Sequence, residues 1–149
     1  VQTKDALLLT NTQNSEQVKD FVKNFQKQKN PKIISESPIT IKPWGTFETL
    51  LHLPGFRVKH IIVNPKAKLS LQMHNHRSEH WVVTEGIATV TCGKKSFVLK
   101  INQATHIDQK VKHRIENQEE FPLHIIEVQI GEYLEEDDII RFADIYGRL

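Results

Sequence analysis

The chain has 149 residues with ordinary hydrophobic (38%) and charged (26%) fractions, so it fits one globular domain with a sizeable core. A net charge of +2 interspersed with acidic residues argues against a nucleic-acid partner, and the lack of a long apolar run or a signal peptide argues against a membrane. The single cysteine, Cys92, excludes an internal disulfide framework and fits a reducing compartment, which we expect to be the cytoplasm.

Residues 1–35 are predicted to form an appended segment outside the main domain. The chain opens on valine instead of methionine, which indicates a truncated chain. Residues 5–10 read as a short strand, after which Asn14 or Ser15 can cap a helix. The helix should end near Pro31, because the residue before a proline disfavours the helical conformation. Its single apolar stripe consists of Val18, Phe21, Val22 and Phe25.

From Lys42 onward the sequence changes to short apolar or alternating runs separated by turn signals that contain Gly, Pro and Asn. Short strands at even spacing, with no long helix between them, predict an antiparallel barrel or sandwich. Closing such a barrel also removes exposed strand edges. Residues 36–149 are therefore assigned to one mainly β domain. Its strands are expected at residues 44–51, 57–63, 69–85 with a bend at 77–78, 87–92, 96–99, 113–117 and 123–130.

The stretch LSLQMHNHRSEHWVVTEG, residues 69–86, contains three of the eight histidines of the chain. Side chains alternate along a strand, so one face, predicted to be core, consists of Leu69, Leu71 and Met73. The opposite face consists of Ser70, Gln72, His74 and His76. Glu79 follows a bend predicted at residues 77–78. Two imidazoles and a carboxylate that converge from rigid strands form a set that binds a divalent transition metal.

The order His-x-His, glutamate, six residues and glycine resembles the first motif of the cupin superfamily, small β-barrels with a metal in the barrel. The longer string QMHNHRSEHWVV resembles a narrower group, the cupin domain of type II phosphomannose isomerases. Those domains usually form the C-terminal part of bifunctional enzymes that also carry a mannose-1-phosphate guanylyltransferase domain. The resemblance implies a cupin-type antiparallel β-barrel (jelly roll), and it identifies residues 1–35 as the tail of a missing nucleotidyltransferase domain with a linker helix.

The resemblance also implies a ligand set for the metal. The expected ligands are His74, His76, Glu79 and His113, with Gln72 as an alternate or additional ligand. His113 and Asn117 fit the end of the second cupin motif. At its start, Asp108 and Lys110 stand where related domains usually carry proline and glycine, which alters the turn but leaves the ligand in place. Mixed imidazole and carboxylate ligands suit zinc, the first candidate, and also manganese, cobalt, nickel or iron.

Phosphomannose isomerases interconvert an aldose phosphate and a ketose phosphate, which implies proton transfer between C1 and C2 through an enediol. This chemistry needs a cation that stabilises the enediolate oxygen and a positioned acid or base. Glu79 and His80 are the candidates for the acid or base. In a regular strand His80 would point away from Glu79, so it would need a backbone bulge to reach the site.

A sugar phosphate also needs a cationic clamp, and the bidentate fork of arginine suits that role. Arg141 and Arg148, seven residues apart in the C-terminal tail, are the main candidates. Lys42 stands where the family usually has arginine, so it keeps the charge without the fork. Arg77 and Lys112 are further candidates, although Lys112 fits a solvated surface better.

Two functions of different classes follow. The first is metal-dependent interconversion of mannose 6-phosphate and fructose 6-phosphate, as the C-terminal part of a bifunctional enzyme of GDP-mannose synthesis. The alternative is a cupin that binds a sugar or nucleotide sugar without turnover. The combination of Glu79, His80, Arg141 and Arg148 favours catalysis, and the arginines favour a phosphorylated substrate over a cupin dioxygenase. The expected partners are a sugar phosphate, the nucleotidyltransferase domain of the full-length protein and, as a working hypothesis, a second copy in a homodimer.

Overall fold

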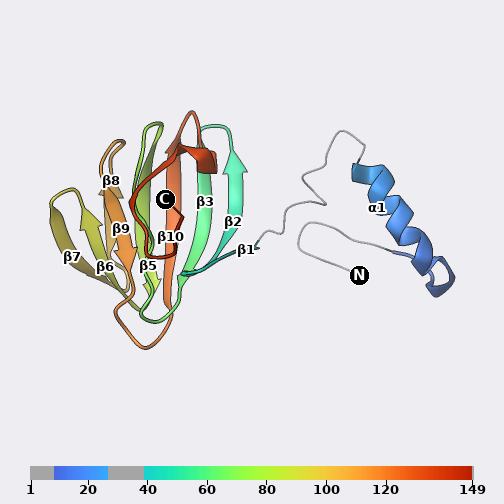
Figure 1. Cartoon of the computed structure of the whole chain (residues 1–149), viewed down its shortest axis with the longest axis horizontal. Coiled ribbons are helices and arrows are strands. Elements are labelled where there is room, and N and C mark those ends of the chain that lie inside the picture. Colours follow the sequence, from blue (N-terminus) through green and yellow to red (C-terminus); the bar gives the residue numbers. More distant parts are fainter. Residues whose placement is uncertain (1–8, 27–38, 149) are drawn as a thin grey trace. The chain divides into compact units, whose positions relative to one another are not determined.

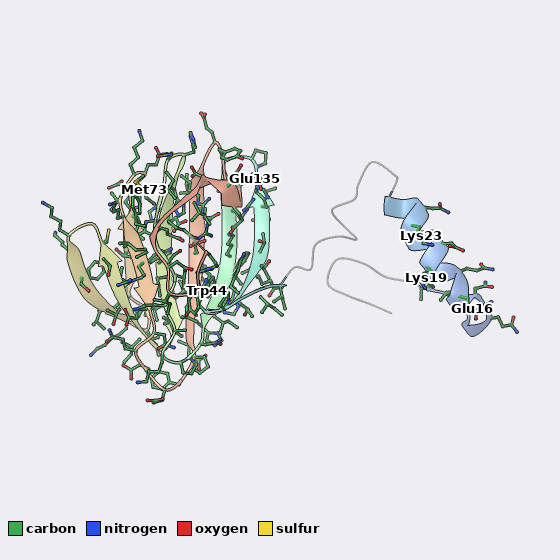
Figure 2. All side chains as sticks on the ribbon, viewed as in Figure 1. Glu16, Lys19, Lys23, Trp44, Met73 and Glu135 are labelled. Carbon is green, nitrogen blue, oxygen red and sulfur yellow. The ribbon has the colours of Figure 1, made fainter. Side chains whose placement is uncertain are left out.

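The computed structural model describes residues 9–26 and 39–148, and its contacts divide the chain into two units, Val1–Ser37 and Pro38–Leu149. In the first unit, the 3₁₀ helix η1 (Thr12–Gln17) leads into α1 (Val18–Gln26), where a helix was predicted. The exposed side chains of Lys19 and Lys23 project from α1 (Figure 2). No helix within the described residues is long and apolar enough to cross a membrane.

The start of this helical segment differs from the prediction. The side chain of Asn11 accepts a hydrogen bond at the start of η1, from the backbone N–H of Asn14 at 3.0 Å, and the side chain of Ser15 lies outside the described residues. The helix therefore begins earlier, as a 3₁₀ turn. Most of the strand predicted at residues 5–10, the helix end near Pro31 and the side chains of Phe21, Val22 and Phe25 lie outside the described residues.

The second unit consists of two antiparallel sheets that face each other (Figure 1). The larger sheet has the order β1 (Ile39–Lys42), β2 (Gly45–Leu53), β3 (Phe56–Val63), β10 (Leu123–Gly131), β5 (Arg77–Glu85) and β8 (Ala104–Ile107). The smaller sheet has the order β11 (Ile139–Ala143), β4 (Leu71–His74), β9 (His113–Glu116), β6 (Ile87–Cys92) and β7 (Lys95–Lys100). A short 3₁₀ helix, η2 (Glu136–Asp138), leads into β11. The predicted mainly β, antiparallel architecture is confirmed.

Three strands lie in segments that were not predicted to be strands: β1, β8 and β11. Each has only four or five residues, and each lies at the edge of its sheet. A short edge strand buries few side chains, so its sequence carries little alternation that would distinguish it from a loop. These strands were missed for that reason.

The interior between the sheets is apolar at one end and polar at the other. Along β10, the buried positions change from Leu123 and Ile125 to Glu127 and Gln129. Along the neighbouring strand β3, the change runs from Val63 and Ile61 to Lys59 and Arg57. The two strands pair so that apolar residues stand opposite apolar ones and polar residues opposite polar ones. Buried polar groups require partners, so the polar end is where a functional site is expected.

Candidate active site

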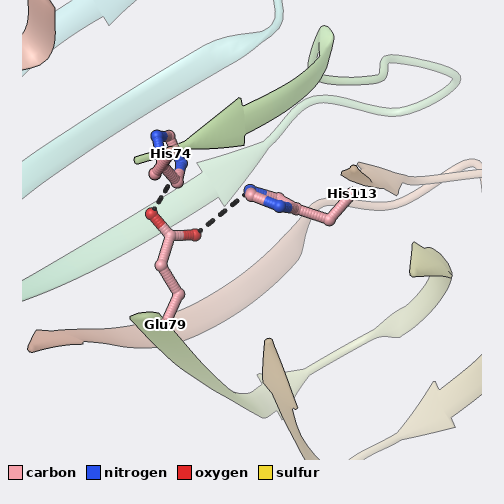
Figure 3. Close-up of side chains that lie close together, drawn as sticks. All are labelled: His74, Glu79 and His113. Carbon is pink, nitrogen blue, oxygen red and sulfur yellow. Dashed lines mark ion pairs between the residues drawn. The ribbon is translucent and has the colours of Figure 1, made fainter. Parts of the chain in front are cut away.

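Three buried side chains meet between the sheets: His74 at the end of β4, Glu79 in β5 and His113 at the start of β9 (Figure 3). Their exposed fractions are 2%, 1% and 1%. Glu79 Oε1 lies 3.0 Å from His74 Nε2, and Glu79 Oε2 lies 3.5 Å from His113 Nε2. One ligand atom from each residue lies within 4.8 Å of the others. These are the donor types that hold a divalent transition metal.

Several atoms of this cluster are buried without a hydrogen-bond partner among the described residues, namely Glu79 Oε2, His113 Nε2 and His74 Nδ1. Leaving a buried polar atom unpaired costs about 1–3 kcal/mol, so the arrangement suits an additional group between them. His113 Nδ1 donates to the carbonyl oxygen of Val111 at 2.8 Å, which leaves a lone pair on Nε2 of the neutral ring. The cluster is therefore compatible with a metal site.

The charge states also fit a cation. Burial lowers the pKa of His113 below its ordinary value, despite the opposing charge of Glu79, so the ring is neutral at neutral pH. Burial by itself would raise the pKa of Glu79, but the hydrogen bond with His74 and electrostatic interactions with His74, His113 and Arg77 hold it well below its ordinary range. Glu79 Oε1 also accepts hydrogen bonds from Arg77 Nε at 3.2 Å and Gln129 Nε2 at 3.3 Å. The cluster thus offers one carboxylate and neutral imidazole nitrogen, as metal binding requires.

The bend between β4 and β5 places His74 in the cluster. The buried carboxylate of Asp138 accepts the backbone N–H groups of Asn75 (3.1 Å) and His76 (3.2 Å). The backbone N–H of Lys110 donates to the carbonyl oxygen of His74 at 2.7 Å. Gly131 passes so close that a Cβ there would lie 2.2 Å from the His76 oxygen, so only glycine fits. These contacts from distant segments fix where β4 ends.

His76, the second predicted imidazole ligand, lies outside the cluster. Its side chain is exposed, and its ring stands edge-on to that of Tyr133, with 5.9 Å between the centroids. The bend predicted at residues 77–78 is wrong, because β5 already begins at Arg77 and the bend occupies Asn75 and His76. The alternation that would have aligned His76 with His74 therefore ends at His74.

The prediction that Leu69, Leu71 and Met73 face the core is confirmed for Leu69, which is 8% exposed, and is wrong for the other two. Ser70 and His74 are 3% and 2% exposed, whereas Leu71 and Met73 are only partly buried. The polar face of β4 therefore points between the sheets. It does so because the interior at this end of the barrel is polar.

His80 lies on the opposite face of β5 from Glu79. The pairing of β5 with β10 continues without a register shift past this residue, so no bulge turns it inward. Its side chain is exposed, and its Nε2 lies 3.0 Å from Nδ1 of His106, whose Nε2 lies 2.8 Å from Asp108. The structure does not bring His80 to the cluster.

A cleft opens beside the cluster, with Glu79 in its lining. Residues from both sheets and from the C-terminal tail form its walls. Its charged lining residues are Lys42, Lys59, Arg77, Glu79, Glu127, Glu136, Arg141 and Arg148. The other lining residues are Trp44, Phe47, Ile61, Leu69, Ser70, Gln72, Gln129 and Ile139. The structure therefore brings the candidate phosphate-binding residues from three separate segments to the same cleft as Glu79.

The two tail arginines differ in how they are held. Arg141 pairs with Gln72 across β11 and β4, and its Nε is buried without a partner among the described residues. Arg148 is bound to Asp144 through Nε at 3.1 Å and through its terminal nitrogen, and the hydrogen bond lowers the pKa of that carboxyl. The exposed side chain of Lys112 lies over the Phe142 ring, 3.8 Å from its centroid.

The polar inner face of β10 was missed from the sequence. Glu127 accepts hydrogen bonds from Trp81 Nε1 at 3.1 Å and from Gln129 Nε2 at 2.8 Å. Burial, with the charge of Glu79, raises the pKa of Glu127 to about 8. The signal for their burial was present, because Glu127 and Gln129 are in phase with the apolar residue Ile125 along a period-two strand.

Residues 29–144 match the family described as mannose-6-phosphate isomerase C-terminal. The chain is 45% identical over 148 residues to the alginate biosynthesis protein AlgA of Pseudomonas aeruginosa, and 43% identical over 148 residues to the mannose-1-phosphate guanylyltransferase of Klebsiella pneumoniae. Each comparison covers 99% of this chain and 31% of the relative, so the chain spans about a third of the length of these curated relatives. The cupin domain of Schizosaccharomyces pombe Cnp3 has a TM-score of 0.57 at 14% identity, covering 62% of this chain and 68% of that chain, and it shows the cupin fold.

Proposed function

The chain belongs to the family of mannose-6-phosphate isomerase C-terminal domains, and on that premise we propose that it interconverts mannose 6-phosphate and fructose 6-phosphate with a bound divalent metal. The observation that carries the proposal is the buried cluster of His74, Glu79 and His113 beside a cleft lined with cations. An uncharged sugar has no group that forms ion pairs with these cations, whereas the phosphate of a sugar phosphate does.

The reaction moves a proton from C2 to C1 of the aldose through an enediol, and negative charge develops on oxygen. A metal, when bound, supplies Lewis-acid stabilisation of that charge. His74, Glu79 and His113 would hold it, with zinc as the first candidate. Gln72, which pairs with His113 across β4 and β9, is a further ligand candidate. Arg77 holds the Glu79 carboxylate in place through its Nε.

Arg141 and Arg148 would bind the substrate phosphate. The Nε of Arg141, which has no partner in the described part of the chain, is a buried donor that an anion would satisfy. Arg148 is oriented by Asp144 and by the Tyr146 ring, whose centroid lies 5.2 Å from its guanidinium carbon. Lys42 lines the same cleft and would add a positive charge. In a longer protein, the domain would work beside a nucleotidyltransferase domain, since one relative is named a mannose-1-phosphate guanylyltransferase.

A coupled assay for mannose 6-phosphate conversion, with and without a chelator, tests this function. We expect conversion that the chelator abolishes and that added zinc, cobalt or manganese restores. Arg141→Ala and Arg148→Ala should each lower kcat/KM about ten- to a hundredfold, because a charge-assisted hydrogen bond contributes about 1.5–3 kcal/mol. Arg114→Ala, outside the cleft lining, is the matched control. Sugar-phosphate binding with no turnover under any metal would favour the non-catalytic cupin instead.

A further inference from the structure

Three carboxyl groups line the cleft, and their surroundings differ. Glu79 is held by two imidazoles and by Arg77. Glu136 forms an ion pair with Lys59 at 2.6 Å. Glu127 is hydrogen-bonded instead by two neutral donors. Carboxyl groups placed in contrasting environments perform different roles in acid–base chemistry, and the one without an ion pair is best suited to exchange a proton.

Glu127 is also fixed in position. It is 5% exposed and stands opposite Lys59 of β3 and Trp81 of β5. Trp81 donates to its Oε2, and the Gln129 amide donates both to its Oε1 and to Oε1 of Glu79. One amide thus links the carboxyl of the metal cluster to a second carboxyl in the same cleft. A side chain restrained on both oxygens has a defined direction toward a bound substrate.

We propose that Glu127 is a catalytic residue that carries the proton between C2 and C1 of the sugar phosphate, an inference that rests on the proposed isomerase function. The Glu127 carboxylate takes the C2 proton, the C2–H electron pair forms the C1=C2 double bond, and the carbonyl pair moves to O1. The O2 proton then passes to O1. The pair on O2 forms the new C2 carbonyl as C1 takes the proton back from Glu127. Glu127 returns to its starting charge and no co-reactant is consumed.

The electrostatic surroundings agree with this role. The charged groups that face Glu127 are Glu79 and Arg77 from β5 and Lys59 from β3. Burial and Glu79 raise its pKa, against Lys59 and Arg77. A carboxylate with a raised pKa is a stronger base, as needed to remove a proton from carbon at neutral pH.

Glu127→Gln in the whole chain tests the assignment with nearly unchanged shape. The new amide keeps an oxygen for Trp81, and Gln129 Oε1, buried without a described partner, can accept from its nitrogen after an amide flip that gives up the Gln129 bond to Glu79, which Arg77 still holds. We expect kcat to fall about 10²- to 10⁴-fold with little change in KM, and deuterium uptake from D₂O at C2 to fall in parallel. Elemental analysis should find unchanged metal content. Glu120→Gln, whose side chain is 82% exposed, should behave as wild type.

Glu127→Asp provides a second variant if the glutamine variant does not melt cooperatively. Its shorter carboxyl should retain a residual rate with a displaced pH midpoint, whereas the wild-type rate should fall as the pH drops below the pKa of Glu127. If the folded variants convert the substrate at rates within about tenfold of wild type, Glu127 does not carry the proton. That result would leave the proposed isomerase function standing. Failure of the metal-loaded wild type to convert the substrate or exchange its C2 proton would overturn the proposed function, and this role with it.

Discussion

His74 and His76 lie in different environments, because β4 ends between them. His74 is the last residue of the strand and points between the sheets, whereas His76 lies beyond the bend and is exposed. Nothing in the residue types separates the two. The difference comes from Asp138, which lies more than sixty residues further along the chain and binds the bend.

Metal content should therefore distinguish a histidine of the buried cluster, such as His113, from His76. His113→Ala removes an imidazole of the buried cluster, so affinity should fall by more than the roughly 10–100-fold that follows loss of a residue that only supports a ligand. His76→Ala should keep both the metal and the rise in melting temperature on metal addition. Elemental analysis and thermal melts with added zinc measure both effects. Equal metal loss in the two variants would place His76 among the ligands.

Sequence patterns identified His74, Glu79 and His113 because the motif spacing carries their types and order. Glu127 was not identified, because it is embedded in an apolar strand whose overall character is that of core. Its significance depends on Trp81 and on the charge of Glu79, which reach it from another strand. Local sequence does not contain that information.

At the scale of elements, the turn before His113 has a lysine, Lys110, at a position whose backbone conformation favours glycine. Lys110 adopts φ 62°, the left-handed conformation that glycine favours, and its N–H binds the carbonyl of His74. A non-glycine residue in this conformation costs about 1–2 kcal/mol. The contacts of the turn outweigh that cost, so the lysine leaves His113 in place.

The sequence of the acidic run before β11 indicates a solvated surface. In the structure, however, Asp138 of η2 binds the backbone of the bend between β4 and β5. Asp138→Ala removes a buried carboxylate that accepts two backbone N–H groups, so the free energy of unfolding should fall by about 1.5–3 kcal/mol. Metal affinity should fall with it, because the bend orients His74. Urea unfolding and metal titration measure the two quantities.

Asp137→Ala is the matched control, since the exposed Asp137 carboxylate bonds the Tyr133 hydroxyl and not the bend. Its unfolding free energy should change by less than about 0.5 kcal/mol. If both aspartate variants lose the same stability, η2 does not act through Asp138.

Strands with a full alternation, such as β3 and β10, lie within one residue of the ranges that the sequence predicts. The edge strand β11 depends on its pairing with β4, where Arg141 stands opposite Gln72. That pairing joins segments far apart in sequence, so pattern alone could not predict it. The same pairing brings Arg141 into the cleft.

At the scale of the whole molecule, the division between apolar and polar interior explains how one barrel supplies both stability and a site. Val63, Ile61, Leu123 and Ile125 form continuous apolar rows across β3 and β10, while the next two rows along the same strands are charged or polar. Because the pairs are in register, the change occurs at one level of the barrel.

We propose that the N-terminal segment is the tail of a nucleotidyltransferase domain. The buried hydrophobic residues described for the chain run from Trp44 to Leu134, all within the unit that begins at Pro38. A chain that begins at Pro38 should thus unfold cooperatively, with a free energy of unfolding within about 1 kcal/mol of the full chain. Denaturant unfolding followed by tryptophan fluorescence measures this directly, since Trp44 and Trp81 both lie in the core. Loss of the cooperative transition would show that residues 1–37 belong to the barrel's own core, and would remove the reason to assign them to another domain.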